Sequence, residues 1–199
     1  MDTHNYIAKT KAQLNDPKHY KKLQSDPTLS IAHEINDIIT YLISTGAISK
    51  ETGTFLEPKY PTKNPNFLRT PKNSHKRYTL RPIVPACDSP TENLSNFIDY
   101  LSQPVMKALP SYIKDTKDFI THVLNVPTLP GNSFLVTADV VSLYTNIPHE
   151  EGTDTFINTL SENKNLLSAE TPPLPTITLI LEFILTHNWK FRTKFLEEL

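Results

Sequence analysis

Prolines constrain this chain more than any other residue type. Seventeen prolines stand against four glycines, and five of them fall within residues 58–82. Proline fixes φ, lacks a backbone N–H and restricts the residue before it, so closely spaced prolines exclude a continuous helix. We therefore predict extended segments or a short hairpin between Phe55 and Val84. The prolines in this stretch are Pro58, Pro61, Pro65, Pro71 and Pro82.

Helical periodicity is confined to other segments of the chain. Asp26-Pro27 begins an apolar run that recurs at helical spacing as far as Gly46, which predicts a capped amphipathic helix. Ser89–Glu92 has the pattern of a capping box and predicts a second helix start, while Pro104 should kink or interrupt that helix. Further helices are predicted after Asp115, after Pro148 and from Ile177 to Leu185.

One carboxylate stands out within a strand-like run. The eight residues from Phe134 to Val141 are β-prone, and Asp139 lies near their C-terminal end. An ionised Asp in an apolar strand is costly unless it is capped by hydrogen bonds or holds a cation. Residue type alone leaves both explanations open. Trp189 to Phe195 alternates aromatic and basic residues and predicts a further strand.

Charge is distributed unevenly along the 199 residues. Residues 1–87 hold 13 Lys/Arg and 7 Asp/Glu, whereas residues 88–199 hold 7 and 14. The segment 58–87 contains no acidic residue, which is typical of a phosphate-binding surface but also of a solvated basic loop. Its basic residues are Lys59, Lys63, Arg69, Lys72, Lys76, Arg77 and Arg81.

Composition narrows the class of protein. Hydrophobic residues make up 38% and charged residues 21%, as in a globular protein of one ordinary domain or part of a larger one. No segment has the length and apolarity of a membrane span or a signal peptide, so we expect a soluble intracellular protein. Cys87, the single cysteine, has no partner for an internal disulfide and no zinc-ligand spacing, which predicts an inert thiol.

Several motifs together resemble one enzyme family. Asp139-Val-Val-Ser-Leu-Tyr144-Thr-Asn-Ile-Pro-His-Glu is similar to motif A of reverse transcriptases, and specifically to that of Penelope-like retroelements. Other blocks of the family are matched in the same order, and the resemblance covers nearly the whole chain. These blocks are Asp2–Tyr6, Leu14–Pro17, Pro71–Lys76 (with one inserted residue), Leu80–Val84 followed by Ser89–Glu92, and Leu109–Thr116.

The resemblance implies an α+β fold, namely a partial polymerase right hand that is helix-rich with a small incomplete antiparallel sheet. Residues 1–88 would form an N-terminal fingers region that includes the basic segment 58–87. Residues 89–199 would form a fingers and palm region with motif A at 134–148. The expected partners are an RNA template, a DNA primer and deoxynucleoside triphosphates, the expected location is nuclear, and no membrane is involved.

The resemblance also implies roles for individual residues. Asp139 would be the catalytic carboxylate that binds Mg²⁺ in a two-metal site, facing into that site, with help from the backbone carbonyl of Val140. Arg81 would grip the incoming triphosphate. Tyr144 would exclude a 2′-hydroxyl, although an ordinary core tyrosine has the same spacing. Lys72 and Lys76 would contact triphosphate or template, or simply lie in solvent.

Parts of the family pattern are missing. The Tyr/Phe-x-Asp-Asp turn completes the metal site in the family, and no Asp-Asp dipeptide occurs in this sequence. The motif B helix, the thumb and the GIY-YIG nuclease also have no counterpart, and Lys194 to Leu199 does not resemble the lead-in to motif B. We therefore expect a truncated reverse transcriptase that is inactive alone. The alternatives are a catalytically dead nucleic-acid-binding module and a helical protein-interaction domain.

Overall fold

The chain was analysed as a computed structural model that divides into two compact units. It describes residues 8, 11, 12, 15, 17, 23–58, 68–72, 79–83, 87–134, 136–140 and 147–187, with backbone alone for 68–72 and 79–83. Unit 1 comprises Met1–Asp99 and Pro172–Leu199, and unit 2 comprises Tyr100–Thr171. The expected polymerase regions, 1–88 and 89–199, stay a prediction.

Unit 1 contains most of the buried helices. They are α2 (Thr28–Ser44), α3 (Lys50–Leu56), α8 (Leu174–His187) and the first part of α4 (Glu92–Ala108). α2 ends as predicted, because Gly46 adopts a φ of 70° just beyond it. The Ser49 hydroxyl caps α3 by accepting from the backbone N–H of Thr52 at 3.1 Å. Hydrogen bonds from its own backbone N–H and from Ser49 lower the pKa of Glu51.

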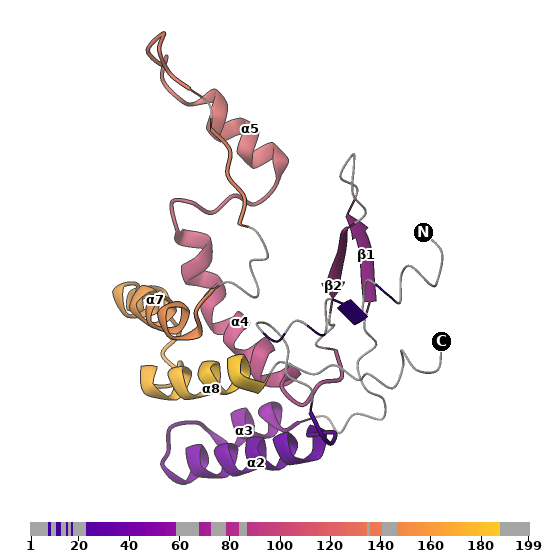
Figure 1. Cartoon of the computed structure of the whole chain (residues 1–199). Coiled ribbons are helices and arrows are strands. Elements are labelled where there is room, and N and C mark those ends of the chain that lie inside the picture. The colour runs from indigo at the N-terminus through magenta and orange to yellow at the C-terminus, as the bar shows by residue number, and fades with distance from the viewer. Residues whose placement is uncertain are drawn as a thin grey trace. The chain divides into compact units, whose positions relative to one another are not determined.

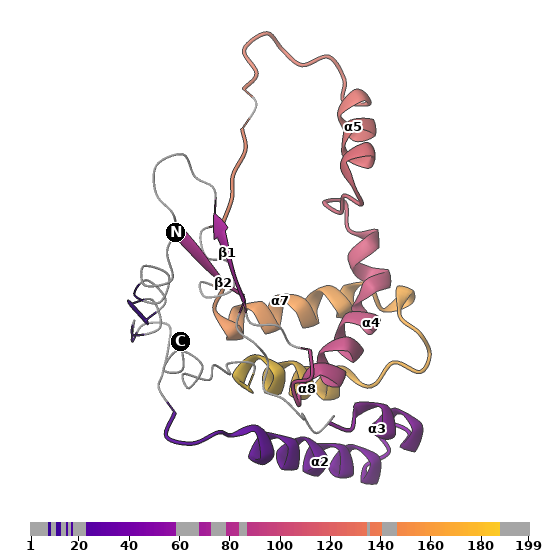
Figure 2. The same ribbon diagram turned by 90° about the vertical axis from the view of Figure 1, so that its right-hand side faces the viewer.

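Apolar side chains from these helices form the core of unit 1. α8 lies alongside α2 in both views of the molecule (Figures 1 and 2). Each helix contributes a buried stripe at helical spacing, which is the pattern of a helix that packs on its neighbours. Asn93 adds a polar tie, because its side-chain amide donates to the carbonyl of Glu57 at 2.7 Å. The buried residues include Ile31, Ile35, Ile39, Leu42, Leu56, Leu94, Ile98, Ile177, Ile180 and Ile184.

Two short strands of unit 1 form an antiparallel hairpin. β1 (Leu68–Lys72) pairs with β2 (Thr79–Ile83), and the two arrows run side by side in Figure 1. Pro71 pairs with Leu80 and Pro82 with Arg69. Because proline has no N–H, these two pairs are the non-hydrogen-bonded ones, and the alternate pairs carry the ladder. A short hairpin was one of the two forms expected for this proline-rich stretch.

Unit 2 is helical with little burial. It consists of the second part of α4, α5 (Thr116–Leu124), α7 (His149–Glu162) and the 3₁₀ turn η1 (Lys164–Leu166). Asp115 caps α5 as predicted, since its carboxylate accepts from the backbone N–H of Asp118 at 2.9 Å. No described residue from 106 to 150 is buried. Among the described residues of the unit, the buried apolar ones are Leu101, Val105 and Leu160.

The predicted α+β class, a partial polymerase right hand with a small antiparallel sheet, was wrong, because the described residues are mostly helical and form no palm sheet. Residues 134 and 136–140, which belong to the run expected to form a strand, adopt no regular structure. An isolated strand is not stable without a hydrogen-bonded neighbour. Within the described ranges, the only strands are β1 and β2, which pair with each other alone. The strand expected from Trp189 to Phe195 lies outside the described residues.

The predicted helices are confirmed, with one correction. α2, α4, α5, α7 and α8 each cover the segment in which periodicity predicted a helix. Of the two outcomes expected at Pro104, a kink or an interruption, the interruption is wrong, since α4 continues through this residue to Ala108. The first turn of α4 is supported by Glu92, which accepts from the backbone N–H of Asp88 at 2.8 Å. None of the helices in the described part of the chain is both long and apolar enough to span a bilayer.

Gly53 of α3 packs closely against α2, and it provides a test of this packing. A Cβ at Gly53 would lie 2.5 Å from Cδ1 of Ile43 and 3.2 Å from Cγ2 of Ile39. Gly53→Val should therefore lower the free energy of unfolding by about 1–3 kcal/mol through overpacking. Urea denaturation measures this change. Thr54→Val, at the exposed neighbouring position, is the matched control, and an equal loss in both variants would contradict the α2–α3 contact.

Candidate nucleic-acid interface

The hairpin brings together two of the residues that the sequence marked as nucleotide-binding. Lys72 pairs with Thr79 and Arg81 pairs with Thr70. These two pairs are two residues apart along each strand, and positions two apart belong to the same face of a β-ribbon. Arg69, which pairs with Pro82, occupies a position on the opposite face. The register therefore groups Lys72 with Arg81 and separates Arg69 from both.

The charge of this segment suits a polyanion. Residues 58–87 carry seven basic residues and no acidic one. Arginine donates to phosphate oxygens in pairs, and lysine acts as a mobile point charge. A two-stranded ribbon with both residue types on one face can follow a phosphate backbone. Lys76, the other predicted contact from this segment, lies outside the described residues.

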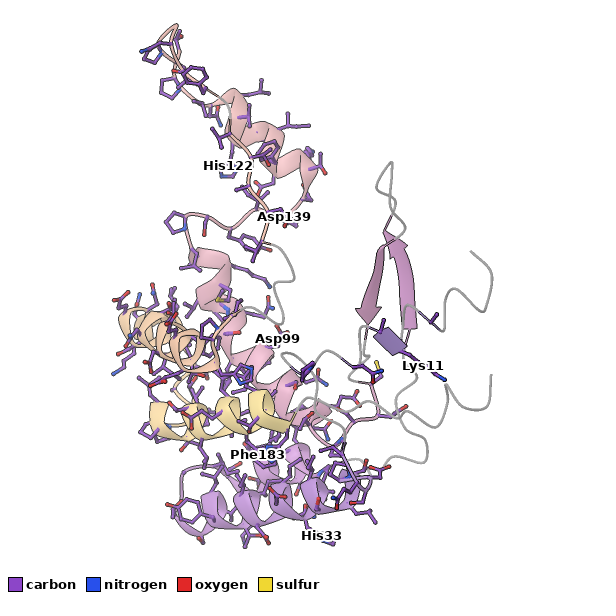
Figure 3. The ribbon with its side chains drawn as sticks, in the orientation of Figure 1. Lys11, His33, Asp99, His122, Asp139 and Phe183 are labelled. Atoms are coloured by element: carbon purple, nitrogen blue, oxygen red, sulfur yellow. The ribbon has the colours of Figure 1, made fainter. Side chains whose placement is uncertain are left out.

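Asp139 is an exposed residue of unit 2, labelled in Figure 3. It lies in the irregular stretch 136–140 rather than at the end of a strand, and its neighbour Val140 is 57% exposed. A carboxylate in water needs no compensating cation, so the cost that made Asp139 notable in a buried strand does not arise here. The exposure of Asp139 thus gives no support to the inward-facing metal ligand expected from the sequence.

The described residues do not fit a two-metal site. No group of three or more His, Cys, Asp or Glu side chains that could hold a metal occurs among them. Mg²⁺ prefers near-octahedral oxygen coordination and is usually held by carboxylates together with phosphate and water. One exposed carboxylate and the carbonyl of Val140 do not supply that set. The magnesium site implied by the resemblance remains a prediction without structural support in this part of the chain.

The other candidate residues fall in different parts of the chain. Tyr144 lies outside the described residues. Arg81 and Lys72 belong to unit 1, and Asp139 belongs to unit 2. Cys87 is exposed and free.

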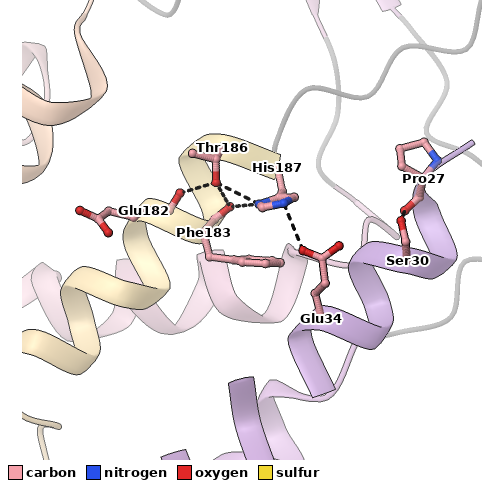
Figure 4. Close-up of polar contacts among 7 residues, drawn as sticks. All are labelled: Pro27, Ser30, Glu34, Glu182, Phe183, Thr186 and His187. Atoms are coloured by element: carbon pink, nitrogen blue, oxygen red, sulfur yellow. Dashed lines mark hydrogen bonds and ion pairs between the residues drawn. The ribbon is translucent and has the colours of Figure 1, made fainter. Parts of the chain in front are cut away.

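One polar contact was not indicated by the sequence. His187 in the last turn of α8 lies 3.4 Å from the carboxylate of Glu34 on α2 (Figure 4). The apolar periodicity of α2 and α8 predicted that both helices pack in the core. It carried no information on which of their polar side chains would contact one another. A basic residue in the last turn of a helix was the one available signal.

The chain was compared with protein-family models, with curated proteins and with solved structures, and no match was found in any of the three comparisons.

The geometry around Asp139 predicts that this residue does not create a Mg²⁺ site by itself. Wild type and Asp139→Asn should therefore show the same change in thermal unfolding midpoint when 5–10 mM MgCl₂ is added, because a bound ion stabilises only the state that holds it. Differential scanning fluorimetry gives the two midpoints. A magnesium-dependent rise seen in wild type and absent from Asp139→Asn would show that Asp139 does bind the ion.

Proposed function

We propose that this chain is part of an RNA-directed DNA polymerase of the Penelope-like retroelement type and that its β-hairpin contacts nucleic acid. The observation that carries the proposal is the register that groups Lys72 with Arg81 on one face of the hairpin. Both residues also lie in motifs that resemble nucleotide-contacting blocks of the family.

The order of the motifs supports the same proposal. Leu80–Val84 overlaps β2, and Ser89–Glu92 leads into the first turn of α4. Leu109–Thr116 connects α4 to α5, and the motif that begins at Asp139 leads into α7 at His149. These four blocks therefore fall on a strand, in a connection between helices or at the start of a helix, where a conformational role is expected.

The proposal assigns no catalytic step to this chain. Phosphoryl transfer in such polymerases depends on two metal ions and on in-line positioning of the reacting oxygens. The described residues do not supply a metal cage around Asp139. We therefore expect contact with an RNA template, a DNA primer or the phosphates of a deoxynucleotide, without DNA synthesis by the chain alone. By the same resemblance it would act in the nucleus.

A second candidate is a catalytically dead nucleic-acid-binding module. The exposure of Asp139 favours it, because a solvated carboxylate is free of the constraints of a metal site. This candidate shares the hairpin contact with the first and differs only in chemistry. The binding experiment below tests what the two have in common, and only primer extension by the chain would separate them.

The hairpin face predicts salt-dependent binding. Affinity for a short RNA or a primer–template duplex should fall steeply as salt rises, because binding to phosphates releases counterions. Lys72→Ala and Arg81→Ala should each reduce the slope of log K against log salt by about 0.7–0.9, which corresponds to one phosphate contact. Fluorescence anisotropy at several KCl concentrations measures the slopes.

Arg69→Ala is the matched control for these variants. It removes the same charge from the same hairpin but at a position on the opposite face, so its salt slope should stay close to that of wild type. An equal loss for all three variants would mean that only net charge matters. No binding at low salt would remove both candidates.

The incomplete metal site predicts no polymerisation. Purified chain, a primed RNA template, Mg²⁺ and deoxynucleotides should give no extended primer above a no-protein control. Mg²⁺-dependent extension that disappears in Asp139→Ala would overturn this expectation. It would also decide against the catalytically dead module.

A further inference from the structure

α5 is a short helix whose apolar side lies in solvent. Phe119, Ile120, Val123 and Leu124 recur at the spacing that places them on one face of a helix. All four are at least half exposed, and Leu124 is 78% exposed. Among the described residues of unit 2, no other helix lies alongside α5 in either view (Figures 1 and 2). The helix therefore has the face of a core helix with no described helix packed on it.

α5 is also too short to persist without packing. It spans nine residues, and its N-terminus is already capped from both directions. Asp115 accepts from the backbone N–H of Asp118 at 2.9 Å, and Asp118 accepts from the backbone N–H of Lys114 at 2.9 Å. Isolated helices shorter than about 12–15 residues are marginal in water. Burial of the apolar face is the contribution that this helix lacks.

The apolar face continues past the end of the helix. The backbone N–H of Val126 donates to the carbonyl of Val123 at 3.2 Å, so the winding extends beyond Leu124, and Val126 is itself 51% exposed. The five side chains from Phe119 to Val126 are called the α5 patch below. At about 150–200 Å² for a fully exposed apolar residue of this size, the α5 patch presents on the order of 500 Å². An apolar patch of about 300–600 Å² is the largest on a typical monomer and often marks an interaction site.

The area of the α5 patch suits a dimer. Homodimer interfaces are about 65% apolar, so 500 Å² of apolar surface corresponds to roughly 800 Å² of total interface on each partner. This is about the area that each partner buries in a standard interface. We propose that α5 pairs with α5 of a second copy of this chain, in an antiparallel contact about a two-fold axis that buries the α5 patch of both copies.

Two-fold pairing explains why one patch is enough. In such a contact both copies use the same surface, so each supplies an apolar face of the same length and area as the other. Neither copy then leaves part of the patch in water. Because burial supplies what a nine-residue helix lacks, formation of α5 and dimerisation are coupled. The contact involves unit 2 alone and is independent of the function proposed for the hairpin.

The charges beside the α5 patch are compatible with a second copy. None of its five side chains is charged. Lys117, three residues before Ile120, borders the patch near the N-terminus of the helix. In an antiparallel pair this lysine lies near the C-terminal carbonyls of the other α5, which attract cations. The acids of the first turn, Asp115 and Asp118, accept backbone N–H groups at the end of their own helix.

Sedimentation velocity of the full chain tests the pairing. Wild type should show a monomer–dimer equilibrium as the concentration rises from about 1 to 100 μM. Val123→Glu should weaken the dimer about 100-fold or more, because each dimer would bury the unpaired carboxylate twice. Thr121→Glu is the matched control, since it adds the same charge to the same helix at an exposed position outside the patch. Its dissociation constant should stay close to that of wild type.

The outcomes separate the alternatives. Neither Val123 nor Thr121 is buried, so both variants should keep the far-UV circular dichroism of the monomer. A wild type that stays monomeric over the whole range would overturn the proposal and leave the patch to a different partner. A dimer that survives Val123→Glu, or that both variants weaken equally, would place the interface elsewhere. Association beyond a dimer would contradict the closed two-fold contact.

Hydrogen exchange gives a second measurement that needs no variant. Backbone amides of residues 120–125 should exchange more slowly at high than at low protein concentration, because α5 is stabilised only in the dimer. Amides of α2, whose apolar side chains are buried within unit 1, are the internal control and should exchange at the same rate at both concentrations. Exchange in α5 that does not depend on concentration would count against the coupling of helix formation to pairing.

Discussion

Burial of apolar side chains among α2, α3 and α8 is the interaction on which unit 1 depends. Ile35, Leu56, Ile177 and Ile180 are fully buried, and each such side chain contributes about 1.5–3 kcal/mol relative to exposure. Polar contacts such as that of Asn93 with Glu57 add specificity at the edges of this core. α5 shows the contrast, because it is well capped but buries no residue, and capping alone does not stabilise a nine-residue helix in water.

Helices could be predicted from the sequence because their signals are local. Asp115 caps with its own side chain, and the stripe from Ile31 to Leu42 repeats within a single element. A strand needs a neighbour, and a β-prone run such as Phe134–Val141 carries no information on whether one is available. Phe134 is 91% exposed. No strand in the described part of the chain pairs with its segment, so this apolar side chain stays in solvent.

The candidate site was predictable to a similar degree. Residue types and proline spacing pointed to the basic hairpin, but only the register could group Lys72 with Arg81 and set Arg69 apart. Asp139 was singled out by its apolar neighbours, and that argument required a buried strand. The meeting of Glu34 with His187 lay beyond prediction, because these residues are far apart in sequence and approach only when α8 packs on α2.

The two hairpin prolines limit what the hairpin can become. In a non-hydrogen-bonded pair the backbone amides point outward, so Pro71 removes a donor from the free side of β1 and Pro82 removes one from the free side of β2. Neither edge of the hairpin can therefore pair along its full length with a third strand. This limits edge-to-edge aggregation between copies of the chain. A ligand that binds this hairpin must contact its side chains, because the hairpin backbone cannot pair fully with an added strand.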